Sequence, residues 1–141
     1  MEADIARNHG SIYDRAGDSL SPRLREMIER GRTVTAVDYG NALDQTAKAA
    51  DYLSELLSEF DAIVTPAASG EAPLGLESTG SPAFCTIWTL CGTPAITMPI
   101  LEGSNGMPMG VQMVGRMGDD ARLLRTARWM VGATETGGED K

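Results

Sequence analysis

The sequence predicts an α/β fold with a mixed sheet, built from about three strands and about four helices. Three observations lead to this class. Apolar residues recur every three or four positions from Val37 to Phe60, which indicates a long amphipathic helix. A short run rich in β-branched residues, Asp61–Pro66, follows and indicates a strand. Two further strand-like runs, Ala95–Ile100 and Met109–Gly115, flank a turn rich in glycine.

Two helices are expected before the first strand. Ser21 and Pro22 are typical of a helix start, and Gly31 suits the position just beyond its end. The longer helix, Val37–Phe60, carries one apolar stripe that must lie against another surface. The stripe consists of Tyr39, Leu43, Ala47, Ala50, Leu53, Leu57 and Phe60.

The middle of the chain is predicted to be a surface loop followed by a short helix and a hairpin. Residues 67–82 are rich in small and polar residues, and Phe84–Cys91 shows helical spacing. The turn Gly103–Gly106 suits an antiparallel return. In the second strand of the hairpin, Gln112 is expected on the face opposite Met109, Val111 and Met113, because side chains alternate along a strand.

The chain is expected to close with a helix and a tail. Asp119 or Asp120 can cap this helix. Its buried side is predicted to carry Leu123, Leu124, Ala127, Met130 and Val131. We interpret residues 1–132 as one segment of a domain and residues 133–141 as a flexible polar tail.

The predicted strands are too apolar for a small isolated sheet. Ile63–Val64 and Ala95–Ile96 have no polar face, and such strands normally lie between other strands with helices on both sides. Three strands would leave an outer edge able to pair with more strands. We therefore expect companion strands from elsewhere.

The composition argues against several partners. The formal charge of −8, from 12 basic and 20 acidic residues, repels phosphates, so nucleic acid is not expected as a partner. The beginning of the sequence lacks a basic and then apolar leader, and no apolar run reaches about 18 residues. We expect no membrane association and a cytoplasmic location.

A search for catalytic or metal-binding residues is negative. His9 is the only histidine. Cys85 and Cys91 lack metal-binding or redox spacing and are expected to be buried thiols. Lys48 lies beside the apolar stripe of the long helix, and the other lysine is Lys141. We expect no metal, no cofactor and no catalytic residue in this chain.

Five short blocks nevertheless follow one another in a specific order and spacing over about 70 residues. They are Phe60–Pro66, Ala72–Pro73, Trp88–Pro99, Met107–Gly115, and Asp120 with Leu123–Leu124. Together they resemble the C-terminal part of the amidase signature family. The stretch from Ser21 to Gly31 is more loosely similar to the preceding family segment, so the resemblance covers nearly the whole chain.

The resemblance implies hydrolysis of carboxylic amide C–N bonds. Family members use a nucleophilic serine, a second serine on a cis peptide bond and a lysine, on an α/β/α sandwich with a mixed sheet. These groups precede the segment that this chain resembles, and no Gly-Gly-Ser-Ser phrase occurs here. The chain is therefore expected to be the C-terminal fragment of an amidase domain, inactive alone, supplying scaffold and a wall of the acyl pocket.

The resemblance also implies which residues face the substrate. The candidates for substrate binding are Ser81, Pro82, Phe84, Ile87 and Trp88. Phe84 and Trp88 lie four residues apart, so mutual packing explains the pair equally well. Amidotransferase subunits that resemble this chain hold the amine of glutamine with an acidic residue near this position. Ser81 and Pro82 provide no carboxylate, which favours an apolar or aromatic amide over glutamine.

Two roles remain open. In the first, the chain is part of an amidase, its partner is the missing N-terminal catalytic part, and its ligand is a small-molecule amide. In the second, it is a noncatalytic interaction or self-association module derived from an amidase, whose exposed sheet edge pairs with a copy of itself or with another protein.

Overall fold

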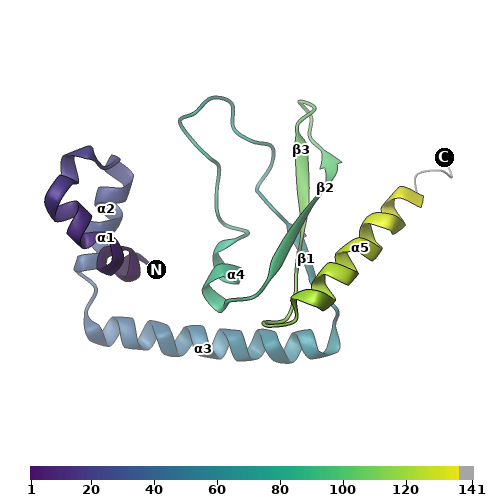
Figure 1. Cartoon of the computed structure of the whole chain (residues 1–141), viewed down its shortest axis with the longest axis horizontal. Helices are drawn as coiled ribbons and strands as arrows, with labels where there is room; N and C mark the ends of the chain where they lie inside the picture. Colours follow the sequence, from purple (N-terminus) through teal and green to yellow (C-terminus); the bar gives the residue numbers. More distant parts are fainter. Residues whose placement is uncertain (137–141) are drawn as a thin grey trace. The chain divides into compact units, whose positions relative to one another are not determined.

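The computed structural model describes residues 1–136, which divide into two compact units, residues 1–46 and residues from 47 onward. Figure 1 shows the elements. They are α1 (Glu2–Ala16), the 3₁₀ turn η1 (Gly17–Ser19), α2 (Pro22–Arg32), α3 (Ala36–Glu59), β1 (Ile63–Pro66), α4 (Thr86–Cys91), β2 (Ala95–Glu102), β3 (Pro108–Val114) and α5 (Asp120–Thr136). The predicted α/β class is confirmed. Helix α1 was not predicted from the sequence.

The first unit is helical and is built on the contact of α1 with α2. The predicted cap is present, because the Ser21 hydroxyl accepts a hydrogen bond of 3.3 Å from the Leu24 backbone amide. Ile28 is completely buried, and Ala6 and Gly31 are buried with it. Small residues where the helices meet let the two backbones approach closely.

The second unit contains a sheet with the strand order β1-β3-β2. Both pairings are antiparallel, and β2 and β3 form the predicted hairpin. Met113 lies opposite Val64 on one side and Ile96 on the other. Within residues 1–136, β1 and β2 each pair with β3 alone, so each is an edge strand.

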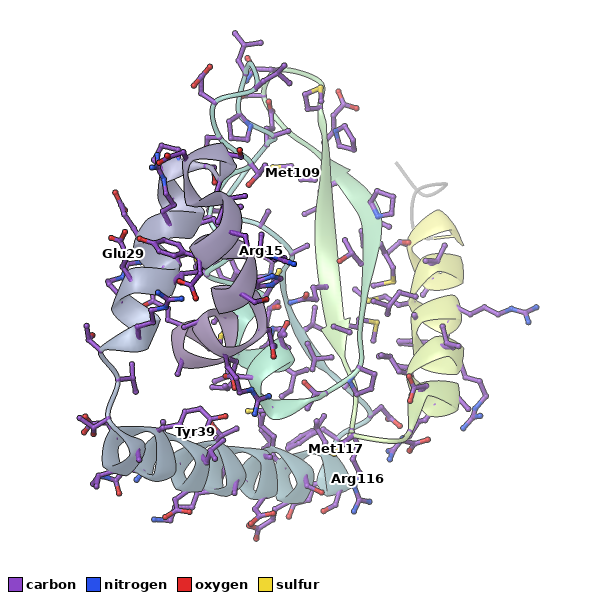
Figure 2. All side chains as sticks on the ribbon, turned by 60° about the vertical axis from the view of Figure 1, so that its left-hand side comes forward. Arg15, Glu29, Tyr39, Met109, Arg116 and Met117 are labelled. Atoms are coloured by element: carbon purple, nitrogen blue, oxygen red, sulfur yellow. The ribbon has the colours of Figure 1, made fainter. Side chains whose placement is uncertain are left out.

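Helix α5 covers one face of this sheet, and α4 lies on the opposite side, as both views show (Figures 1 and 2). The hydrophobic core between α5 and the sheet is formed by Met98, Met113, Leu123 and Ala127. The opposite face carries Gln112, as the alternation of side chains predicts.

Strand β2 contains a bulge between Met98 and Leu101. Met98 pairs with Val111 and Leu101 with Met109, so β2 uses one residue more than β3 over this stretch. Pro99 lies within the bulge and has no backbone N–H to donate to a ladder, which suits it to this position.

Three details differ from the sequence-based expectations. The apolar stripe predicted for the long helix is buried only in part. Leu53 and Leu57 are buried, whereas Leu43 and Phe60 are more than half exposed. Leu124 is 57% exposed, since α5 turns its narrow buried side, with Leu123, toward the sheet. Cys85 is exposed rather than buried, because it lies at the start of α4.

The predicted tail remains a prediction. Helix α5 continues to Thr136, so residues 133–136 belong to it. Residues 137–141 lie outside the described part of the chain.

Candidate functional site

The second unit contains an apolar cavity of about 480 Å³ at the end of β1, which we call the β1-end pocket. It is lined by Val64, Thr65, Pro66, Ala68, Ser69, Gly70, Phe84, Leu101, Met109, Gly110 and Val111. These residues come from β1, the loop after it, the segment before α4, and the hairpin. A cavity of this volume is within the range of small-molecule sites.

The course of β1 creates the pocket. The strand ends at Pro66, and the Ala67 amide makes one further hydrogen bond of 3.0 Å, to the Gly110 carbonyl oxygen of β3. After that bond the chain leaves the sheet and forms a loop whose first residues line the pocket together with Met109. Met109 lies near the start of β3 and is labelled in Figure 2. The loop and the hairpin therefore form two walls with β1 between them.

Gln112 connects the sheet to the segment that carries Phe84. Its side chain is 4% exposed, and Nε2 donates to the Thr65 hydroxyl oxygen at 3.2 Å and to the Phe84 carbonyl oxygen at 2.9 Å. A buried amide is stable only when its donors find acceptors. Gln112 consequently fixes the position of two residues that line the pocket.

The predicted binding residues separate in the structure. Phe84 lines the pocket, whereas Ser81, Pro82, Ile87 and Trp88 are not among its lining residues. Ser81 and Pro82 are exposed and shape the turn into α4, because the Pro82 carbonyl oxygen accepts from the backbone amides of Cys85 at 2.9 Å and Thr86 at 3.1 Å. Ile87 is 46% exposed. Whether any of the five contacts substrate stays a prediction.

Trp88 is half-buried, and its indole Nε1 is fully enclosed without a hydrogen-bond acceptor in the described part of the chain. A buried indole N–H normally finds an acceptor. Trp88 therefore carries an unused donor on α4, close in sequence to the pocket residue Phe84.

The sequence predicted the surface loop that forms one wall of the pocket but not the hairpin residues that form the other. Residues 67–82 were predicted to form a surface loop, and Ala68 to Gly70 of this loop line the cavity. Leu101 and Met109 were not anticipated, because their positions depend on the bulge in β2 and on the hairpin register. The only signal for them was the glycine-rich turn between the strands.

No cluster of three or more potential metal ligands occurs within residues 1–136. Lys48, the one lysine that could be considered for catalysis, is exposed on α3. No helix in the same range combines the length and apolar character needed to cross a bilayer.

Comparison with known proteins identifies the family. The model of the Amidase family matches residues 7–124. This chain belongs to the Amidase family. It is 30% identical over 135 residues to the putative amidase AmiD of Mycobacterium tuberculosis, covering 89% of this chain and 28% of AmiD. It is 31% identical over 128 residues to a fatty acid amide hydrolase of Medicago truncatula, covering 82% of this chain and 21% of the plant protein.

A solved amidase structure agrees with the fold. The TM-score is 0.78 at 26% identity, and the alignment covers 94% of this chain and 33% of the solved chain. The chain therefore spans about a third or less of the length of these Amidase-family proteins. Its fold is that of one portion of an amidase.

Proposed function

We propose that this chain is the C-terminal part of an amidase and supplies scaffold and a substrate-pocket wall for the hydrolysis of carboxylic amide C–N bonds. The observation that carries the proposal is the β1-end pocket, an apolar cavity of about 480 Å³ in a chain of the Amidase family. The nucleophilic serine, its partner serine and the lysine are supplied by another part of the enzyme. The chain alone is inactive.

The pocket favours an uncharged, apolar acyl group. Most of its walls are aliphatic or aromatic, and its hydroxyl groups are those of Thr65 and Ser69. Glu71 follows the lining residue Gly70 directly and places a carboxylate at the rim, which disfavours an anionic ligand. Neither Ser81 nor Pro82 offers a carboxylate to an amine. We expect apolar or aromatic amides to be better substrates than glutamine.

A chimera tests the proposal directly. The matched segment of Mycobacterium tuberculosis AmiD is replaced by this chain, and release of arylamine from a neutral aryl amide is compared with release of ammonia from glutamine. We expect aryl-amide hydrolysis by the chimera and none by the chain alone. Hydrolysis by the isolated chain that disappears in Lys48→Ala would overturn the assignment of catalysis to another part.

The pocket is tested in the same chimera with the two phenylalanines of this chain. Phe84→Ala removes an aromatic wall and should raise KM for the aryl amide roughly tenfold. Phe60→Ala makes the same chemical change at a residue that is 54% exposed and serves as the control. Equal effects of the two changes would argue against the β1-end pocket as the substrate site.

The edges of the sheet favour a second candidate, a noncatalytic module that associates with its own copy. Within the described residues, β1 and β2 each have one strand neighbour, and such edges can pair with another chain. Pro66 at the end of β1 and Pro99 within β2 remove donors from these edges, which weakens this candidate. A stable dimer in size-exclusion chromatography, together with an inactive chimera, would favour it.

A further inference from the structure

Glu71 joins the two walls of the β1-end pocket. Its carboxylate accepts two hydrogen bonds from Asn105, one from the backbone amide to Oε1 and one from Nδ2 to Oε2, both of 2.8 Å. Asn105 lies in the turn between β2 and β3. The two residues are 34 positions apart in the chain, so this contact closes a long loop.

The position of this contact relates it to the pocket. On the loop side, Glu71 is preceded by the lining residues Ala68, Ser69 and Gly70. On the hairpin side, Asn105 lies between the lining residues Leu101 and Met109. A bond between Glu71 and Asn105 therefore ties one wall to the other at the rim.

Gly103 provides independent support for a specific fit. A Cβ atom at Gly103 would overlap the carboxylate and the Cγ of Glu71, so the turn accommodates Glu71 only because this residue has no side chain. The turn itself is closed by the Gly103 amide, which donates to the Met107 carbonyl oxygen at 2.9 Å. The hairpin turn is thus shaped both to close itself and to receive the Glu71 side chain.

The remainder of the loop offers little to hold it in place. Leu74 and Leu76 are fully exposed, and the Gly80 amide bonds only locally, to the Ser78 hydroxyl oxygen at 3.1 Å. Charge-assisted hydrogen bonds such as those of Glu71 are stronger than neutral ones. Glu71 is therefore well placed to restrain the loop that forms the outer wall.

We propose that Glu71 is a positioning residue, a latch that binds the turn at Gly103–Gly106 and thereby sets the width of the β1-end pocket. The role as a substrate site rests on the proposed function, whereas the latch rests on the contacts alone. Removing the latch frees the loop, widens the pocket and weakens the binding of an apolar amide.

The test uses the full chain, with hydrogen exchange at backbone amides and fluorescence titration with N-(2-naphthyl)acetamide. In Glu71→Ala, we expect exchange at Asn105, and at Ala67 at the start of the loop, whose amide donates to the Gly110 carbonyl oxygen, to become roughly tenfold faster, and naphthyl amide binding to weaken. Glu71→Gln keeps the length of the side chain and one acceptor oxygen but loses the charge and the second acceptor, so it should restore only part of both properties. Glu77→Ala removes an exposed acid from the same loop and should leave both unchanged.

A second variant approaches the contact from the other side. Gly103→Ala leaves Glu71 in place but occupies its space, and should reproduce the effects of Glu71→Ala. In the Glu71→Ala background, Gly103→Ala should add little further change, because the clash is gone. This pair keeps the test informative if one single variant folds poorly.

The possible failures are distinguishable. Unchanged exchange at Ala67 in both Glu71→Ala and Gly103→Ala would overturn the latch. If the wild-type chain does not bind the naphthyl amide, the pocket as substrate site is wrong, while hydrogen exchange still decides the latch. Binding that survives despite faster exchange would show that Glu71 restrains the loop without setting the pocket, which also contradicts the proposal.

Discussion

Gln112 connects strand β3 to Phe84 by a hydrogen bond from its side chain to the Phe84 carbonyl oxygen. It is the buried polar side chain on the face of β3 opposite Met113, and it donates to both Thr65 and Phe84. Its location on that face followed from simple alternation along the strand. Its partners did not, because Phe84 lies 28 residues away in the chain.

We predict that Gln112→Leu destabilises the second unit by about 1–2 kcal/mol, because the Phe84 carbonyl oxygen and the Thr65 hydroxyl lose their donor. Both tryptophans, Trp88 and Trp129, belong to this unit, so urea unfolding followed by tryptophan fluorescence measures the effect. Glu55→Leu, at an exposed position of α3 within the second unit, is the control and should change stability by less than about 0.5 kcal/mol. Equal effects of the two changes would contradict the role given to Gln112.

At the scale of elements, the contact between α1 and α2 is a close approach of two backbones. Gly31 of α2 faces the Glu2 carbonyl, and a Cβ there would overlap that oxygen and lie 2.8 Å from the Ala6 Cβ. Gly31 was expected to lie just beyond the end of a helix. It is instead inside α2, where it serves packing.

We predict that Gly31→Ala destabilises the first unit by about 1–3 kcal/mol, as overpacking does. Gly40→Ala is the matched control, since Gly40 is also helical and a Cβ there would meet nothing within 4 Å. Alanine at residue 40 should stabilise the helix by about 0.5–1 kcal/mol. Thermal unfolding followed by far-ultraviolet circular dichroism should therefore show shifts of opposite sign, and shifts of the same sign would refute this packing.

Polar contacts add a pH dependence to the same unit. The Tyr39 hydroxyl, labelled in Figure 2 on α3, donates to the Asp4 Oδ1 of α1 at 2.7 Å. This bond lowers the pKa of Asp4 and raises the pKa of Tyr39. Arg30 of α2 donates to the carboxylate of Glu2 on α1, which lowers the pKa of Glu2.

Because the pKa values of the two carboxyl groups are lowered and that of the tyrosine is raised, the first unit is expected to be most stable between the acidic and the alkaline pH ranges in which these groups titrate. For Asp4 and Glu2, whose pKa values are lowered on folding, the contribution is present above their ordinary pKa values and is lost as pH falls through the lowered ones. For Tyr39, whose pKa is raised, it is present below the ordinary tyrosine pKa and is lost as pH rises through the raised value.

We predict that stability falls less steeply with pH in Tyr39→Phe than in the wild type, in both the acidic and the alkaline range, because the hydrogen bond between Tyr39 and Asp4 contributes to the pH dependence in both ranges. Urea midpoints measured by circular dichroism across pH test this expectation. Tyr52→Phe, at a side chain that is 65% exposed, should leave the profile unchanged. A Tyr39→Phe profile that coincides with the wild type would exclude the bond as a source of pH dependence.

At the scale of the whole molecule, each of the two units buries apolar side chains of its own within residues 1–136. Those of the first unit lie around Ile28 in residues 1–46, and those of the second lie around Met113 and Leu123 from residue 47 onward. Because each unit buries its own apolar side chains, unfolding need not be a single cooperative step.

We predict that circular dichroism, which reports helices of both units, and tryptophan fluorescence, which reports the second unit, give different unfolding midpoints. Gly31→Ala should shift the dichroism curve and leave the fluorescence curve in place. Coincident curves that move together in this variant would show that the two units unfold as one.

The sequence by itself predicted the three strands, the helices α2 to α5 and the family, but not helix α1. Helix spacing, the Ser21 cap, the β-branched run of β1 and the glycine-rich turn each lie within a short stretch, where local backbone preferences and periodicity act. The five blocks that resemble amidases are likewise a property of the linear chain, and the Amidase family match agrees with them.

Only the tertiary structure decided the strand order, the bulge at Pro99, the second wall of the pocket and the contact of Glu71 with Asn105. Each depends on residues that meet across long stretches of chain, such as the 34 positions between Glu71 and Asn105. Local preferences carry no information about such meetings, because the packing of the whole sheet sets the distance between the partners.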